Sequence, residues 1–170
     1  DPLDIEFALT WDLPPGSLVP MTNLKCICSL GQGVDHVFRD PHLPAGAKVM
    51  RLVDPWMAQA MSEWMLLNIL RFHRQVPEYE ALERQKIWKV LQAPETSERR
   101  IGVLGLGALG SDTARKVAAL GFAVAGWSRT EKRIDGVTSF HGASQLTAFL
   151  NRTEILCCLL PLTPATEDLI

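Results

Sequence analysis

The chain has 170 residues, of which 47% are hydrophobic and 21% are charged, and its formal net charge at pH 7 is −2. This length suits one ordinary domain or parts of two small ones, and the composition excludes a disordered or fibrous protein. A net charge this small provides no large cationic field, so we expect neither nucleic acid nor a membrane as a partner. Apolar runs such as residues 24–30 are far shorter than the ~18 residues that cross a bilayer.

The first 54 residues alternate short apolar stretches with proline and glycine. Strands are predicted over residues 5–11, 24–29 and 47–52. Residues 13–16 contain two prolines and a glycine and cannot continue the first strand, and Gly31-Gln32-Gly33 follows the second. The intervals leave room for short helices, as in an α/β layer.

A long helical segment is expected to begin at Asp54 and Pro55, which suit the cap and the first turn of a helix. Apolar residues at three- and four-residue steps predict one packed stripe, formed by Met57, Met61, Trp64, Met65, Ile69 and Phe72. Pro77 should break or kink the helix, and a second amphipathic helical piece is predicted over residues 79–90. Residues 92–100 are polar and should form a loop.

The remaining residues predict strands that alternate with helices. Strands are expected over residues 101–104, 122–127 and 155–160, with helices over residues 112–120 and 144–150. The strands are continuously apolar, which is typical of a parallel sheet that helices cover on both faces. The fold class is therefore α/β, with a doubly wound parallel sheet.

A G-x-G-x-x-G pattern lies between the first of these strands and its helix, which is the context of a Rossmann-like dinucleotide-binding unit. Gly105 would form the tight turn, Gly107 would admit the pyrophosphate, and Gly110 would let the helix pack closely on the strand. The N–H groups of Ala108 and Leu109 would face the phosphates at the positive end of the helix dipole. The alternative is a glycine-rich turn that binds no ligand.

The end of the second strand indicates which dinucleotide is preferred. A classical NAD site has an acidic residue there, but this chain has Ser128, Arg129 and Thr130, with Lys132 close behind. A guanidinium pairs well with a phosphate, so we predict NADP(H), with NAD(H) as the weaker cofactor. The alternative is a basic cluster on a solvated loop.

Other side chains with reactive groups give weaker signals. The four cysteines, in Cys26-x-Cys28 and Cys157-Cys158, suit neither a zinc site nor a redox pair, and we expect buried reduced thiols in a cytosolic protein. The histidines show no metal spacing; they are His36, His42, His73 and His141. For Arg51, beside Asp54, a structural ion pair and a substrate role both remain open. Asp35 is expected to fix its loop as an acceptor.

Five stretches of the chain, residues 30–35, 51–54, 102–110, 127–130 and 159–166, carry a resemblance that extends over essentially all 170 residues. The chain resembles the D-isomer-specific 2-hydroxyacid dehydrogenase family, and most of all its glyoxylate/hydroxypyruvate reductase A branch. The resemblance implies that residues 1–54 are part of a flavodoxin-like substrate domain and that residues 55–98 form a crossover helix and dimerisation arm. Residues 99–170 would then begin the dinucleotide-binding domain of a homodimer.

The resemblance also implies roles for single residues. The loop of Gly31, Gln32 and Gly33 would bind the substrate carboxylate through backbone N–H groups, and Trp11 would lie at the mouth of the site. A further set would line the cofactor cleft: Leu160, Pro161 and Thr163.

The implied activity is NADPH-dependent reduction of small 2-keto acids, such as glyoxylate and hydroxypyruvate, in the cytoplasm. The alternative is a dinucleotide-sensing, corepressor-like protein on the same fold, although Arg129 favours the reductase. The catalytic Arg, Glu and His of the family are expected after Ile170, so no catalytic residue is assigned. The chain starts at Asp1 without an initiator Met and is expected to be an inactive fragment by itself.

Overall fold

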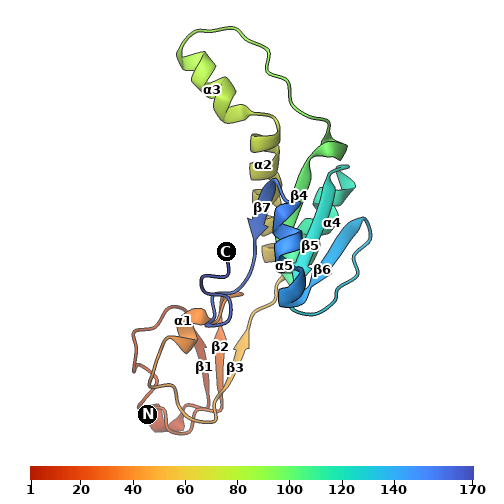
Figure 1. The fold of residues 1–170 in the computed structure, drawn as a ribbon. Coiled ribbons are helices and arrows are strands. Elements are labelled where there is room, and N and C mark those ends of the chain that lie inside the picture. Colours follow the sequence, from red (N-terminus) through yellow and green to blue (C-terminus); the bar gives the residue numbers. More distant parts are fainter. The chain divides into compact units, whose positions relative to one another are not determined.

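A computed structural model describes all residues from 1 to 170 and divides the chain into two compact units. One unit comprises Asp1–Asp54 together with Pro161–Ile170, and the other comprises Pro55–Leu160. Figure 1 labels the helices and strands of both units.

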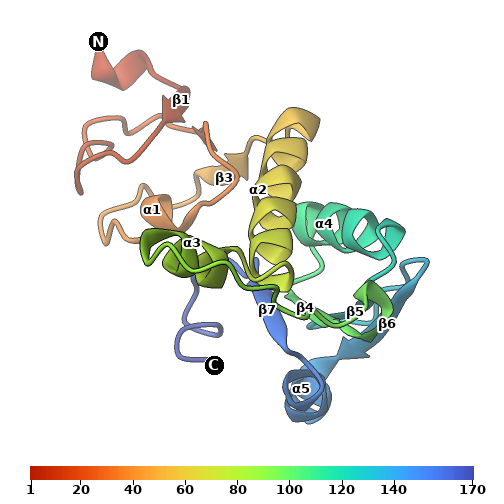
Figure 2. The ribbon, with the colours of Figure 1, turned by 90° about the horizontal axis from the view of Figure 1, so that it is seen from above.

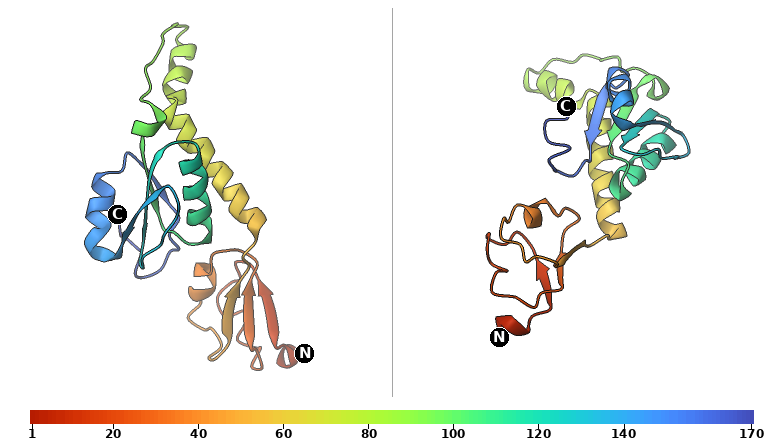
Figure 3. Two further views of the ribbon diagram at one scale, coloured as in Figure 1. Left: turned by 90° about the vertical axis from the view of Figure 1, so that its right-hand side faces the viewer. Right: turned by 60° about the horizontal axis from the view of Figure 1, so that its bottom comes forward.

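The first unit contains a three-stranded parallel sheet in the order β1-β2-β3, seen with its strands side by side in Figure 3. Its elements are a 3-10 helix at Pro2–Asp4, β1 (Phe7–Thr10), β2 (Cys26–Ser29), α1 (Asp35–Phe38) and β3 (Lys48–Arg51). All three strands lie within the predicted stretches, which confirms them. They are shorter by two or three residues, as is usual at strand ends.

One face of this small sheet forms its core. Ala8, Ile27 and Val49 are in register on adjacent strands and point to the same face, where Val37 of α1 packs with them. The opposite face carries exposed apolar side chains, among them Phe7, Leu9 and Met50.

The second unit is a four-stranded, wholly parallel sheet in the order β6-β5-β4-β7. Figure 2 shows α2 and α4 on one face of this sheet and α5 on the other, as predicted for a doubly wound α/β fold. Its elements are α2 (Pro55–His73), α3 (Val76–Arg84), a 3-10 helix at Thr96–Glu98, β4 (Arg100–Leu104), α4 (Ala108–Ala119), β5 (Ala123–Ser128), β6 (Val137–His141), α5 (Gly142–Asn151) and β7 (Ile155–Cys158).

Two features of this unit differ from the sequence predictions. Strand β6 was not predicted, because Val137–His141 has only two apolar residues, Val137 and Phe140, and lies at the sheet edge, without the continuous apolar run of the inner strands. Helix α4 begins at Ala108, not at Asp112, and therefore includes Gly110, the last glycine of the motif. The earlier start places the second half of the motif inside the helix.

The buried stripe of α2 also differs from the prediction. Trp64 and Phe72 are 60% and 57% exposed, while Ser62, Ile69 and His73 are the buried residues of the helix. The predicted stripe was chosen by hydrophobicity alone. In the structure α2 packs on α4 through Ser62 and Thr113, so the buried face is rotated towards small and polar residues.

The segment after α2 projects away from the sheet (Figure 1). A break occurs close to Pro77 as predicted, since α2 ends at His73 and α3 starts at Val76. The second helix was predicted to reach residue 90 but ends at Arg84, and Lys86 adopts a left-handed backbone with a φ of 55° that no helix can continue. Trp88 is left 97% exposed.

All four cysteines are free thiols, as expected, but not all are buried. Cys26 and Cys157 are buried, Cys28 is intermediate, and Cys158 is exposed because it ends β7. Burial raises the pKa of the Cys157 thiol to about 11, so this thiol stays protonated and unreactive at neutral pH. None of the helices combines the length and apolar character that a membrane crossing requires.

Candidate functional site

The glycine motif forms the turn between β4 and α4, and the structure separates the roles of its glycines. Gly105 has a φ of +102°, a conformation that side chains with a Cβ rarely adopt. A Cβ at Gly110 would lie 1.8 Å from the carbonyl oxygen of Gly105, so only glycine allows this approach of helix and strand. Both glycines are therefore required by the fold itself.

Gly107 has no such requirement within the chain. Nothing lies within 4 Å of the position that its Cβ would take, and its φ of −72° suits any residue. It caps α4, whose first N–H groups, on Ala108 and Leu109, have no acceptor inside the helix. An open approach to the positive end of a helix dipole is a fitting place for a phosphate.

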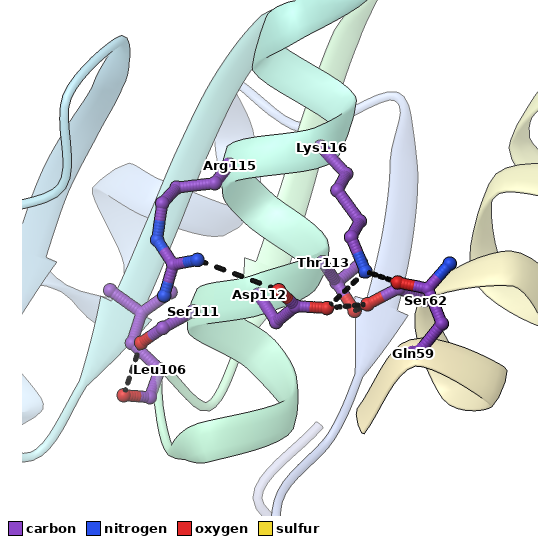
Figure 4. Close-up of polar contacts among 8 residues, drawn as sticks. All are labelled: Gln59, Ser62, Leu106, Ser111, Asp112, Thr113, Arg115 and Lys116. Carbon is purple, nitrogen blue, oxygen red and sulfur yellow. Dashed lines mark hydrogen bonds and ion pairs between the residues drawn. The ribbon is translucent and has the colours of Figure 1, made fainter. Parts of the chain in front are cut away.

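A serine that the motif does not include fixes this turn. The Ser111 hydroxyl donates to the Leu106 carbonyl oxygen at 3.0 Å, as Figure 4 shows. Leu106 in turn packs its buried side chain against Gly126 of β5, where a Cβ would lie 2.5 Å from it. The only signal for Ser111 in the sequence is its place directly after the last glycine.

A polar cluster joins α4 to α2 one turn further along (Figure 4). The Ser62 hydroxyl donates to the Asp112 carboxylate at 2.7 Å, and the Lys116 ammonium lies 2.6 Å from the same carboxylate and also contacts Gln59. Burial acts to raise the pKa of Asp112, but hydrogen bonds from Lys116 and Ser62 and the nearby positive charges outweigh it and lower the pKa. These contacts of the Asp112 carboxylate and of Lys116 hold α4 against α2.

The carboxyl ends of three parallel strands meet at the glycine turn. The N–H of Gly105 donates to the carbonyl oxygen of Trp127 at 2.8 Å, at the end of β5. Leu159, just after β7, donates to Leu104 at 2.8 Å, and the Leu160 side chain lies 3.1 Å from the place of a Gly105 Cβ. Leu160 and the residues that follow Trp127 are therefore brought to the same turn, as in the crevice of a doubly wound sheet.

The segment after β5 carries unpaired positive charge. Glu131 forms an ion pair with Arg133 at 3.3 Å, whereas Arg129 and Lys132 are exposed and form no ion pair. The Ser128 hydroxyl donates to the carbonyl oxygen of Thr130 at 2.7 Å. Ser128 therefore shapes the turn that presents Arg129, and its proton is already used within the chain.

The last two predicted cofactor residues, Pro161 and Thr163, belong to the unit formed with residues 1–54. There Thr163 starts a turn in which its N–H donates to the Thr166 hydroxyl at 2.9 Å.

The predicted substrate loop, residues 31–33, follows β2 in the first unit. Trp11 covers it, since a Cβ on Gly31 would lie 2.1 Å from the indole ring. Arg51 donates to the Gln32 carbonyl oxygen at 3.1 Å, so it holds the loop from β3. Asp35 forms an ion pair with Arg39 at 2.7 Å, and its carboxylate also lies beside Gly33, where a Cβ would be 2.9 Å away.

These observations define a class of protein. A parallel sheet covered on both faces, a glycine turn with an open Gly107, and basic residues at the end of the next strand together form a dinucleotide-binding unit of the Rossmann type. The residues present fit such a ligand, because the only motif position free of contacts is the one that a pyrophosphate would approach.

Comparison with known proteins identifies the family. Residues 66–170 match the model of the NAD-binding domain of D-isomer specific 2-hydroxyacid dehydrogenases. The chain therefore belongs to the D-isomer specific 2-hydroxyacid dehydrogenase family, as its sequence motifs predicted.

The relatives share both sequence and fold with this chain. Glyoxylate/hydroxypyruvate reductase A of Yersinia enterocolitica and of Serratia proteamaculans are each 41% identical over 97% of this chain and 54% of their own length. A 2-hydroxyacid dehydrogenase structure from Xanthobacter autotrophicus, in complex with NADPH, matches with a TM-score of 0.92 and 42% identity over 98% of this chain and 52% of its own. An NADPH-dependent glyoxylate/hydroxypyruvate reductase from Sinorhizobium meliloti, in complex with NADP and sulfate, matches with a TM-score of 0.90 and 43% identity. This match covers 96% of this chain and 51% of the other. The chain thus spans about half the length of the relatives it matches.

Proposed function

We propose that this chain supplies the cofactor-binding and carboxylate-binding parts of an NADPH-dependent reductase of small 2-keto acids. The proposal is supported by relatives named glyoxylate/hydroxypyruvate reductase A at 41% identity and by solved relatives that bind NADPH or NADP. None of these relatives is a dinucleotide-sensing protein, so the corepressor-like alternative gains no support.

The second unit would hold the cofactor. The N–H groups of Ala108 and Leu109 would bind the pyrophosphate above Gly107, and Leu160 would contact the cofactor beside Gly105. Arg129 would pair with the 2′-phosphate of NADP, since it has no ion pair within the chain. Thr130 and Lys132 would add a hydroxyl and a positive charge. When bound, the nicotinamide supplies the hydride of the reaction.

The first unit would hold the substrate. The carboxylate of a 2-keto acid would bind to the N–H groups of the 31–33 loop, beside Trp11. We assign no catalytic residue to this chain.

The observation that carries the proposal is the unpaired Arg129 next to the glycine turn. The test is an absorbance assay of the whole protein, which follows the loss of NADPH with glyoxylate and with hydroxypyruvate. We expect turnover of at least one of them with NADPH. No turnover of any small 2-keto acid would refute the reductase.

We also propose that the whole protein is a homodimer that is clasped through α2 and the segment after it. The support is a set of exposed apolar side chains on one continuous piece of the second unit: Trp56, Trp64, Leu67, Phe72, Ile87 and Trp88. A segment with this much exposed apolar surface is typical of an interface between subunits. Four free thiols also support a reducing compartment, and we propose the cytoplasm.

A further inference from the structure

We propose that Ser29, held by His36, is a positioning residue that presets the 31–33 loop for the carboxylate of the substrate. The inference rests on the proposed function, because it concerns the same loop. It adds a buried hydroxyl and an imidazole that the glycine pattern of the sequence does not single out.

Ser29 joins both ends of the loop. It is the last residue of β2 and is only 2% exposed. Its hydroxyl oxygen lies 3.0 Å from the carbonyl oxygen of Gly33, 3.2 Å from that of Gly31, and 3.2 Å from the N–H nitrogen of Gly31. A single side chain therefore contacts the first and the last residue of the loop.

His36 determines which group accepts the hydrogen bond from the Ser29 hydroxyl. Its Nε2 atom lies 3.3 Å from the Ser29 hydroxyl, which has one proton to donate and two lone pairs that accept. When Ser29 donates to Gly33 and accepts from the N–H of Gly31, its second lone pair accepts a hydrogen bond from the Nε2–H of His36. An imidazole without a proton on Nε2 would instead draw the Ser29 proton away from the loop.

Trp11 keeps the imidazole in this position. The two rings lie 5.3 Å apart between centroids and are tilted by 53°. The same indole covers Gly31, so one aromatic side chain contacts both the loop and the histidine that orients Ser29.

The result is a loop in which two carbonyl groups accept hydrogen bonds while two N–H groups stay free. Ser29 donates to the carbonyl oxygen of Gly33, and Arg51 donates to that of Gln32. The N–H groups of Gln32 and Gly33 donate no hydrogen bond within the chain. Successive free N–H groups on a fixed backbone bind an anion, and a loop that is already ordered loses less entropy when it does so.

The test compares Ser29→Ala, His36→Phe and His36→Gln in the whole protein. His36→Phe keeps a ring beside Trp11 but lacks the donor, whereas His36→Gln keeps an N–H donor. For Ser29→Ala and His36→Phe we expect the KM for glyoxylate and the Kd of oxamate, an unreactive analogue, to rise about tenfold, the effect of one lost hydrogen bond. The value of kcat should change much less, the Kd of NADPH should not change, and His36→Gln should recover most of the oxamate affinity.

Ser17→Ala is the matched control, because the Ser17 hydroxyl donates to a backbone carbonyl, that of Pro14, at 2.7 Å in a different loop of the same unit. It should change neither KM nor the Kd of oxamate. Unchanged oxamate binding in Ser29→Ala and His36→Phe would overturn the inference, as would an equal loss of NADPH affinity. If Ser29→Ala does not fold, equal behaviour of the two His36 variants would overturn it. Failure of the wild-type protein to reduce any 2-keto acid, with oxamate still bound, would refute the proposed function alone.

Discussion

Gly107 and Gly110 belong to one motif, but their surroundings predict opposite consequences of adding a methyl group. Gly110→Ala should lower the free energy of unfolding by about 1–3 kcal/mol, since its Cβ would meet the carbonyl oxygen of Gly105. Gly107→Ala has open space and should change stability by less than about 0.5 kcal/mol, while NADP affinity falls at least about tenfold. Thermal unfolding without cofactor and a titration with NADP separate the two effects. An equal loss of stability in both variants would show that Gly107 serves the fold and not the ligand.

At this scale, residue types were easier to predict than their contacts. The motif predicted a tight turn at Gly105 and close packing at Gly110, and the backbone of the structure has both. Ser111 and Ser29 were not singled out, because a serine that donates to a carbonyl four or five residues away leaves no pattern in the sequence. Such bonds depend on the three-dimensional path of the loop.

The contact between α2 and α4 predicts a dependence of stability on pH. The pKa of Asp112 is lowered in the folded chain, so its contribution is complete above the unfolded value of about 3.9 and is lost as pH falls through the folded value. Asp112→Asn should therefore lower the free energy of unfolding by on the order of 1 kcal/mol at pH 7 and by less at pH 3. Urea unfolding at both values measures the difference.

Asp135→Asn is the control for this prediction, since Asp135 is exposed and forms no ion pair. It should change stability by no more than about 0.5 kcal/mol at either pH. If the loss caused by Asp112→Asn is the same at pH 3 as at pH 7, the charge of the carboxylate does not stabilise the contact between the helices.

Helices and strands were predicted where hydrophobic periodicity alone decides them. The apolar strands β4, β5 and β7 and the start of α2 all lie where the sequence indicated. The edge strand β6, the end of α3 and part of the buried face of α2 were not, because neighbours distant in sequence determine them. Of the predicted stripe of α2, Ile69 is buried and Met65 packs against the core. In α2 Ser62 is buried against α4, whereas Trp64 is exposed.

The proposed homodimer makes a prediction for the whole molecule. Leu67 is 59% exposed on α2, and Leu67→Glu would place a charge in the apolar contact between subunits. We expect light scattering at micromolar concentration to give a monomer for this variant and a dimer for the wild type. Leu120→Glu changes a similarly exposed leucine at the end of α4 and should leave the dimer intact. A wild-type monomer, or dissociation in both variants, would contradict an interface through α2.

The division into two binding regions could be predicted only in part. Periodicity and the glycine motif predicted the dinucleotide-binding unit, whereas the substrate loop was identified only through its resemblance to a family. A loop that binds through backbone N–H groups needs glycines and a tethered backbone. It contains no characteristic side chain from which the sequence alone would reveal the ligand.

The most direct test of the account is a titration of the wild-type protein with NADP and with NAD, repeated with Arg129→Ala. One charge-assisted contact contributes ~1.5–3 kcal/mol, so NADP should bind roughly ten- to a hundredfold more tightly than NAD. Arg129→Ala should remove most of this preference and leave NAD affinity unchanged, because residues 105–110 hold the pyrophosphate separately. Arg100→Ala, at the opposite end of the same sheet, should leave both affinities unchanged. Equal affinity of the wild type for NADP and NAD would contradict the assignment of Arg129 and of the cofactor.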